Sequence, residues 1–220
     1  MNTAEYLPLL ALQYKPGISD AIAKKLLFHF KTPDQVVAAG KSQLRQLQWF
    51  PQHLLHHWNF TAEIEKAKTE LEQIEKHNIS ILAFNDVNYP NRLQQCIDGP
   101  LLLFYKGTPP WHKKRWISIV GTRRMTLYGQ EQCEQIVRQL RSFDPVIVSG
   151  LAYGVDITAH KTALDLGLST VACLANGLDS VYPARHKKFA SQMLQQGALL
   201  SETWTNGEFH NKFFINLGIQ

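Results

Sequence analysis

Three short segments of the chain combine glycine with arginine, lysine or aromatic residues, and the first has the chemistry of an anion site. Gly121 directly follows an apolar run and is followed by Thr122, Arg123 and Arg124. A glycine lets the backbone approach an anion closely, and the arginine fork matches two phosphate oxygens. We therefore predict that these four residues bind phosphate; a glycine turn with solvated arginines is the alternative. The segment lacks the later glycines of a G-x-G-x-x-G dinucleotide motif.

The second segment runs from Ser149 to His160 and carries Gly150 and Gly154 around a turn that precedes a helix. Free backbone N–H groups at such a turn form a concave anion site, so Ser149, Gly150 and Gly154 are candidate binding residues. Asp156 and His160 lie four positions apart, a spacing that suits an acid–base pair or two metal ligands. A helix-capping aspartate and a buried, hydrogen-bonded histidine explain both residues as well, and they lack a third ligand.

The third segment adds an aromatic ring and positive charges. Tyr182 precedes Pro183, and Arg185, Lys187 and Lys188 follow at the start of an expected helix. Lysine in a first helical turn opposes the helix dipole, so its presence there indicates a functional role; a solvated basic face is the alternative. The Tyr182 ring could stack on a base or close the core.

Alternating strands and helices are the elements that would position these segments. Apolar runs predict six strands, and helical periodicity predicts three helices between them. The expected strands are Ile79 to Phe84, Leu101 to Tyr105, Trp116 to Val120, Val146 to Ser149, Ser169 to Leu174 and Ala198 to Ser201, and the expected helices are Gly129 to Arg141, Asp156 to Leu166 and His186 to Gln196. Because strand-to-helix loops of a parallel sheet leave from one edge, we expect the first three segments and a fourth, Glu202 to Trp204, to share one crevice.

The hydrophobic pattern of the sequence changes near Asn78, which divides the chain into two expected domains. Residues 1–78 show helical periodicity, with a Pro-Gly break at 15–20 between two helices. Residues 79–220 alternate strands and helices, which predicts right-handed crossovers and a parallel sheet with helices on both faces. The predicted fold class is therefore α/β, with an extended Rossmann-like sheet preceded by a small all-α domain.

Composition excludes several classes of protein. The 220 residues are 45% hydrophobic and 19% charged, which is typical of a globular chain. The net charge is +5, and residues 111–220 contribute +4 of it (12 Lys+Arg against 8 Asp+Glu), a balance that permits a nucleic-acid partner. The longest apolar runs are strand-sized and the first lysine is Lys15, so we expect neither a membrane span nor a secretory signal. The three cysteines lack metal-ligand spacing, so we expect no metal, no disulfide and a cytoplasmic location.

Five ordered motifs in residues 86–202 resemble the DprA/Smf family, the bacterial DNA-processing proteins of natural transformation. The matching stretches are Tyr89-Pro-Asn-Arg-Leu93 with Asp98 to Gly107, Ile119 to Arg124 with Tyr128-Gly129, Ser149 to His160, Gly177 to Pro183, and Leu200-Ser-Glu202. The resemblance implies a Rossmann-like domain that binds single-stranded DNA without sequence specificity, protects incoming DNA, forms a homodimer and loads the RecA recombinase. It implies neither an enzymatic activity nor a cofactor.

The resemblance assigns roles to positions in two of the segments. The arginine of the family's Gly-Ser-Arg motif corresponds to Arg123, with Thr122 in place of the serine. The basic residue after the Tyr-Pro motif corresponds to Lys187 or Lys188, and the sequence leaves this choice open. His186 stands where the family usually has asparagine.

Both ends of the chain depart from the family pattern. Residues 16–27 look like the family's small helix-hairpin-helix or SAM-like domain, but Ser19 replaces the second hairpin glycine, so we expect a structural or dimerisation role there. After Glu202 the family's Phe-Pro-x-Arg-Asn-Arg segment is missing, and aromatic residues such as Trp204 and Phe213 follow. We expect either a divergent, shortened member or a truncated one that has no winged-helix module.

Two other functions fit parts of the sequence. The related lysine-decarboxylase-like proteins bind nucleotides and cleave nucleoside monophosphates; here Asp156, Asp179 and Glu202 would have to supply the carboxylates, although their spacing pairs none of them as acid and base. A scaffold that only dimerises through an aromatic C-terminal surface is the third hypothesis.

Overall fold

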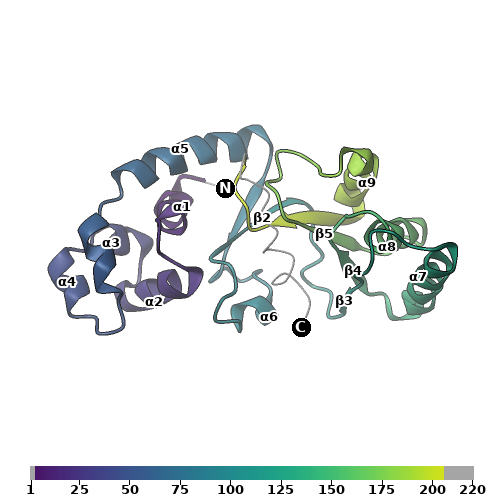
Figure 1. Cartoon of the computed structure of the whole chain (residues 1–220), viewed down its shortest axis with the longest axis horizontal. Coiled ribbons are helices and arrows are strands. Elements are labelled where there is room, and N and C mark those ends of the chain that lie inside the picture. Colours follow the sequence, from purple (N-terminus) through teal and green to yellow (C-terminus); the bar gives the residue numbers. More distant parts are fainter. Residues whose placement is uncertain (1–2, 206–220) are drawn as a thin grey trace. The chain divides into compact units, whose positions relative to one another are not determined.

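The computed structural model describes residues 3–205, which form two compact units (Figure 1). The first unit comprises Met1–Glu75 with Ala83–Leu102, and the second comprises Lys76–Leu82 with Leu103–Gln220. The segment Ala83–Leu102 thus returns to the first unit after the chain has entered the second. The domain boundary that we place between residues 78 and 79 stays a prediction.

The first unit is built from short helices, as its periodicity predicts. The elements are η1 (Thr3–Tyr6), α1 (Leu7–Tyr14), α2 (Asp20–Phe30), α3 (Pro33–Ala38), α4 (Lys41–Arg45), η2 (Gln52–His57), α5 (Thr61–Lys76) and α6 (Asn91–Gln94). The Pro-Gly break separates α1 from α2. The Ser19 hydroxyl oxygen then accepts the Ile22 N–H at 3.3 Å and caps α2, so Ser19 serves the helix start.

A buried ion pair and a row of aromatic rings hold the first unit together. The Lys15 ammonium lies 3.0 Å from the Glu63 carboxylate, and both side chains are almost fully buried. The Trp58 ring meets Phe50 and Phe60 edge to face, with ring centroids 5.3 Å and 5.0 Å away. Such aromatic pairs add to the stability that burial of their area already gives.

The second unit contains most of a six-stranded sheet. Its strands are β1 (Ser80–Ala83), β2 (Leu102–Gly107), β3 (Trp116–Ser118), β4 (Val146–Ser149), β5 (Thr170–Leu174) and β6 (Gly197–Ser201), in the order β1-β2-β6-β5-β4-β3. The six predicted strands are confirmed, and β3 to β6 run parallel. Strand β2, however, pairs antiparallel with β6. Turns rather than a crossover helix follow β2, so the chain reverses direction before β3.

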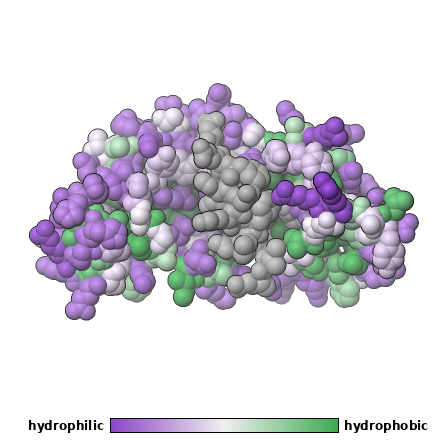
Figure 2. All heavy atoms as spheres, in the orientation of Figure 1, coloured by the Kyte–Doolittle hydropathy of each residue, from purple (hydrophilic) through white to green (hydrophobic). Residues whose placement is uncertain are grey.

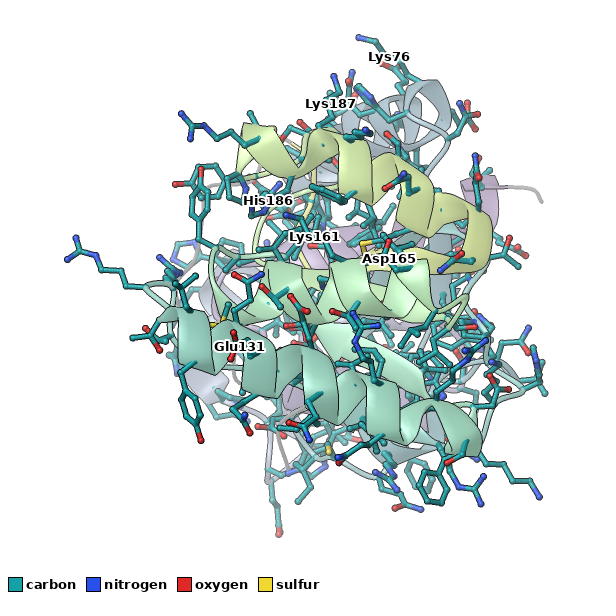
Figure 3. The ribbon with its side chains drawn as sticks, turned by 90° about the vertical axis from the view of Figure 1, so that its right-hand side faces the viewer. Lys76, Glu131, Lys161, Asp165, His186 and Lys187 are labelled. Atoms are coloured by element: carbon teal, nitrogen blue, oxygen red, sulfur yellow. The ribbon has the colours of Figure 1, made fainter. Side chains whose placement is uncertain are left out.

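Helices α7 (Leu127–Leu140), α8 (Val155–Asp165) and α9 (Lys187–Gln196) lie side by side in one layer against the sheet (Figure 3). Val137 of α7 and Ala159 of α8 pack with Ile147 of β4. On the opposite face, Trp111 and Trp116 stack with centroids 5.7 Å apart and pack against the neighbouring valines. The α/β class is confirmed. We expected helices on both faces, whereas the described part of the second unit has helices on one face and aromatic side chains on the other.

Within residues 3–205, no helix is both long enough and apolar enough to cross a bilayer.

Candidate functional site

The loops at the carboxyl edge of β3, β4 and β5 surround a cavity of about 40 Å³. Its lining comes from the loops after these three strands and from the segment before η4 (Ala184–His186). The lining residues are Arg123, Gly150, Ala152, Tyr153, Leu174, Ala175, Asn176, Tyr182 and Pro183. The structure therefore brings the first three predicted segments together. The fourth, which we expected in the same crevice, does not line the cavity; its Trp204 backbone lies against Gly177, where an added Cβ would be 2.3 Å from the Trp204 carbonyl oxygen.

The first two loops are joined by direct backbone contact. The Val155 N–H donates to the Thr122 carbonyl at 3.2 Å, and Gly154 adopts a φ of +76° beside it. A Cβ on Gly154 would lie 2.1 Å from the Thr122 carbonyl oxygen, so this position requires glycine. The Ser149 hydroxyl donates to the Ile119 carbonyl at 2.6 Å and is buried. Ser149 and Gly154 thus shape the site from behind and do not line the cavity.

The buried carboxylate of Asp156 accepts N–H groups of the second loop. Its Oδ2 accepts from the Gly150 N–H at 3.2 Å and from the Ala152 N–H at 3.4 Å. Burial raises the pKa of Asp156, while these hydrogen bonds, the Ser149 side chain and the charge of Arg123 act in the opposite direction. We expected free N–H groups at this turn, but Gly150 and Ala152 already donate to the protein's own carboxylate. An anion at this turn would therefore find these two N–H groups already engaged.

His160 lies in the interior beneath this loop. Its Nδ1 is 2.7 Å from the Thr170 hydroxyl, which itself donates to the Ile147 carbonyl at 2.9 Å, so Nδ1 carries the proton. Burial lowers the pKa of His160 to about 3, against the opposing effect of the Ser149 backbone. A neutral, fully buried imidazole cannot reach a ligand at the surface. The structure thus supports the buried histidine. The prediction that Asp156 caps the helix is wrong: Gly154 is the N-cap of α8, and Asp156, inside the first turn, accepts N–H groups of the preceding loop instead. Residues 3–205 contain no cluster of three potential metal ligands.

His186 connects the second loop to the third, a contact that the sequence did not predict. Its Nδ1–H donates to the Leu151 carbonyl at 2.7 Å, and the Tyr153 ring meets the imidazole edge-on with centroids 4.9 Å apart. The Asn176 side-chain amide donates to the Ser180 carbonyl at 3.1 Å, which fixes the third loop. Tyr182 remains 61% exposed at the cavity mouth.

The predicted binding residues occupy three kinds of place. Arg123, Gly150 and Tyr182 line the cavity, and Ser149 and Gly154 lie behind it. The remaining candidates are exposed without lining it: Gly121, Thr122, Arg124, Arg185, Lys187 and Lys188. Lys187 lies at the start of α9 and Lys161 on α8 in the same helical layer (Figure 3).

Sequence reasoning missed several residues of the site, among them Tyr153, Asn176 and His186. Tyr153 lies between the two glycines of the second loop, and Asn176 comes two positions after β5. Both positions could have been found from the rule that ligands lie beyond the carboxyl ends of parallel strands. The contact of His186 joins positions 35 residues apart and left no local signal.

These features define a class: a Rossmann-like α/β domain with a small cavity, lined by an arginine and two tyrosines, at the carboxyl edge of its parallel strands, accompanied by a helical unit. The chain belongs to the DNA recombination-mediator protein A family, whose model matches residues 80–216.

Curated relatives agree with this assignment. The chain is 32% identical over 162 residues to the putative DNA processing protein DprA of Mycobacterium tuberculosis, an alignment that covers 68% of this chain and 42% of that protein. It is 28% identical over 206 residues to protein Smf of Synechocystis sp., covering 92% of this chain and 52% of that protein. The chain spans about half the length of the curated relatives it matches.

Two solved structures are similar to this chain. DNA processing protein A from Streptococcus pneumoniae superposes with a TM-score of 0.73 over 96% of this chain and 70% of that chain. The two sequences are 24% identical, and the likeness shows the shared fold. DNA processing protein A from Helicobacter pylori, solved for its single-stranded DNA binding mode, gives a TM-score of 0.54 at 30% identity over 62% of this chain and 60% of that chain.

Proposed function

We propose that this protein binds single-stranded DNA without sequence specificity and acts in DNA processing during natural transformation. The observation that carries the proposal is the pairing of Arg123 with the exposed ring of Tyr182 around one cavity. A guanidinium binds phosphate oxygens through charge-assisted hydrogen bonds, and a tyrosine ring offers a stacking surface to any base. The single-stranded DNA binding of the Helicobacter pylori relative supports the same ligand.

The size of the cavity favours a polymer that lies across it over a nucleotide held within it. At about 40 Å³ the cavity has room for a few water molecules. Pockets that hold small ligands typically measure about 300–1,000 Å³. A strand would therefore bind at the mouth, with phosphates on Arg123 and on Lys187 or Lys188. Phosphate contacts and base stacking carry no sequence code, which accounts for binding without specificity.

Each predicted residue has a place in this arrangement. Arg123 and Tyr182 would contact the strand directly, and the exposed Arg124 and Arg185 would add to the positive field. Gly121 and Thr122 belong to the same loop as Arg123, and Gly150 lines the cavity. Ser149 and Gly154 would act as positioning residues that hold the first two loops together.

Transfer of the strand to the RecA recombinase and assembly as a homodimer complete the proposal. The family's description as a recombination mediator supports the first of these. That description applies to full-length relatives, of which this chain spans about half. Binding of RecA and formation of a homodimer are therefore to be measured directly on this chain.

Three observations weigh against the nucleoside-monophosphate-cleaving alternative. Asp156 is engaged by its own loop, His160 is buried, and burial raises the pKa of the Cys173 thiol to about 12. A nucleophile or general base needs both access to its substrate and a suitable pKa.

Arg123→Ala tests the proposed site. Loss of one charge-assisted phosphate contact is worth about 1.5–3 kcal/mol, so the affinity for oligo(dT) should fall about 10-fold or more, measured by fluorescence anisotropy. Glu131→Ala, on the exposed surface of α7 (Figure 3), is the control and should leave the affinity nearly unchanged. Unchanged affinity of a folded Arg123→Ala protein would reject the site, and equal losses in both variants would indicate general destabilisation.

A further inference from the structure

The helical unit displays two exposed aromatic rings, each with a lysine ammonium near its ring. Phe28 on α2 is 81% exposed, and the Lys31 ammonium lies 4.8 Å from its ring centroid. Trp49, which follows α4, is 40% exposed, and the Lys25 ammonium lies 5.8 Å from its ring centroid. We refer to Trp49, Lys25, Phe28 and Lys31 as the aromatic–lysine strip.

The four residues form a continuous strip because α2 connects the two pairs. Lys25 and Phe28 are three positions apart on this helix, so they are neighbours on its surface. The apolar residues Ala23, Leu26 and Leu27 are buried on the other side of α2 and fix the helix to the unit. Ring and ammonium therefore alternate in the order Trp49, Lys25, Phe28, Lys31.

The charge around the strip is strongly one-sided. Residues 20–60, from the start of α2 to Phe60, contain four lysines and one arginine but only two acidic residues, Asp20 and Asp34. Lys25, Lys31, Lys41 and Arg45 are all exposed. In the view of Figure 2, hydrophobic side chains are interspersed among hydrophilic ones over the helices at the left. The strip thus combines a positive surface with exposed apolar rings.

We infer that the aromatic–lysine strip is a second binding surface for a single-stranded polynucleotide. Unstacked bases stack on aromatic rings, and the ammonium groups between the rings neutralise the phosphates that link those bases. A duplex keeps its bases stacked on one another and would leave Phe28 and Trp49 without partners. An acidic protein segment would use the lysines but would not need the rings.

The inference rests on contacts within the helical unit and not on the cavity at the sheet edge. It also does not involve the hairpin at residues 15–20, whose Ser19 is occupied in capping α2. The structural or dimerisation role that we expect for this half of the chain concerns other contacts and stays a prediction.

Photo-cross-linking of the full chain tests the strip. Oligo(dT) and oligo(U) of equal length, each carrying 4-thio-substituted bases, would be cross-linked to the wild type and to Arg123→Ala, and the attached residues mapped by mass spectrometry. We expect cross-links at Phe28 and Trp49 in both proteins. The two oligonucleotides show whether the strip binds DNA, RNA or both. Cross-links confined to the second unit would overturn the inference and leave the proposed function intact. Cross-links at the strip together with an unchanged affinity in Arg123→Ala would support the inference and reject the proposed site at the sheet edge.

Affinities of strip variants provide the second measurement. Phe28→Ala should weaken oligo(dT) binding about 5-fold or more, because stacking on one ring contributes at least about that factor, while Phe28→Tyr should retain it. Val87→Ala removes a side chain that is 96% exposed elsewhere in the same unit and should change nothing. Equal competition by polyglutamate, or loss of self-association in Phe28→Ala with unchanged oligonucleotide binding, would overturn the inference.

Discussion

The protonation of a single buried residue, His160, links the folding of the site to pH. The imidazole is fully buried, and its Nε2 has no hydrogen-bond partner, so the folded protein holds it neutral. Its pKa is about 3 in the folded chain against an ordinary value of 6.5. Below pH 6.5 the unfolded chain therefore binds a proton that the folded chain does not. The contribution of the neutral imidazole to the free energy of unfolding is fully present above pH 6.5 and is lost as the pH falls toward 3.

We predict that acid destabilises the wild type more than His160→Gln, which does not titrate. One group contributes about 1.4 kcal/mol per pH unit, so the wild type should lose about 2 kcal/mol more than the variant between pH 7 and pH 5. Urea unfolding at both pH values measures this difference. His56→Gln, at an exposed position, should behave like the wild type. Equal losses in the wild type and His160→Gln would contradict the proposed cost of protonating His160.

At the scale of elements, the contact between the first two loops is the feature on which the site depends. The Thr122 carbonyl accepts the Val155 N–H and lies against Gly154, so the loop after β3 and the start of α8 are held together. Arg123, the next residue, is positioned by this contact. Any side chain at position 154 must push the two loops apart.

Gly154→Ala should therefore lower both stability and affinity for oligo(dT). Gly154 has φ +76° and ψ −124°, a backbone conformation that costs an alanine about 1–3 kcal/mol, and the added Cβ would lie 2.1 Å from the Thr122 carbonyl oxygen. Gly167→Ala is the matched control, because Gly167 has a φ of +70° with no atom within 4 Å of the added Cβ. Thermal unfolding should show a larger loss for Gly154→Ala, with weaker oligo(dT) binding in that variant alone. Similar losses in both variants would show that the loop contact contributes nothing beyond backbone strain.

Local patterns predict the elements well, because the spacing of apolar residues within a short stretch of sequence favours either a strand or a helix. The apolar spacing of Cys133, Ile136 and Val137 predicts α7, although Ile136 is 52% exposed and only the other two are buried. The loops of the site followed from the positions of the strand ends. The antiparallel direction of β2 depends on pairing with β6, almost a hundred residues later, and no local pattern records it.

Interactions within the site were harder to predict than its location. The sequence predicts Asp156 as a helix cap, whereas its carboxylate accepts the Gly150 and Ala152 N–H groups, an arrangement that depends on how the loop folds back. The contact of His186 with Leu151 likewise depends on the third loop meeting the second. Residue types indicated the chemistry of the edge, whereas the geometry decided which groups remain available for a ligand.

At the scale of the whole molecule, the positive charge should make the affinity for a polynucleotide depend on the salt concentration. The net charge of +5 lies mostly in residues 111–220, where the proposed strand contacts also lie. Each phosphate neutralised on a single strand contributes about −0.7 to the slope of log affinity against log salt concentration. The slope thus counts the phosphates that the protein contacts.

For about three phosphates at the sheet edge, we predict that this edge contributes roughly −2 to the slope for oligo(dT) binding, to which phosphates neutralised at the aromatic–lysine strip would add. Arg123→Ala should reduce the steepness by about 0.7, because one phosphate contact is lost. Titrations at several salt concentrations measure both values. A slope near zero would refute the electrostatic part of the proposal, and an unchanged slope in Arg123→Ala would assign the contacts to other residues.

The carboxylate of Asp156 has a consequence for how a strand would leave. Because this group already takes the Gly150 and Ala152 N–H bonds, a phosphate that moved deeper would find those donors engaged by an acidic side chain. Under the proposed function, nucleotides would thus stay in shallow contact, and each could be released singly without any loop opening. Such a strand would exchange stepwise with a competitor that binds the same backbone, which would suit its delivery to a recombinase.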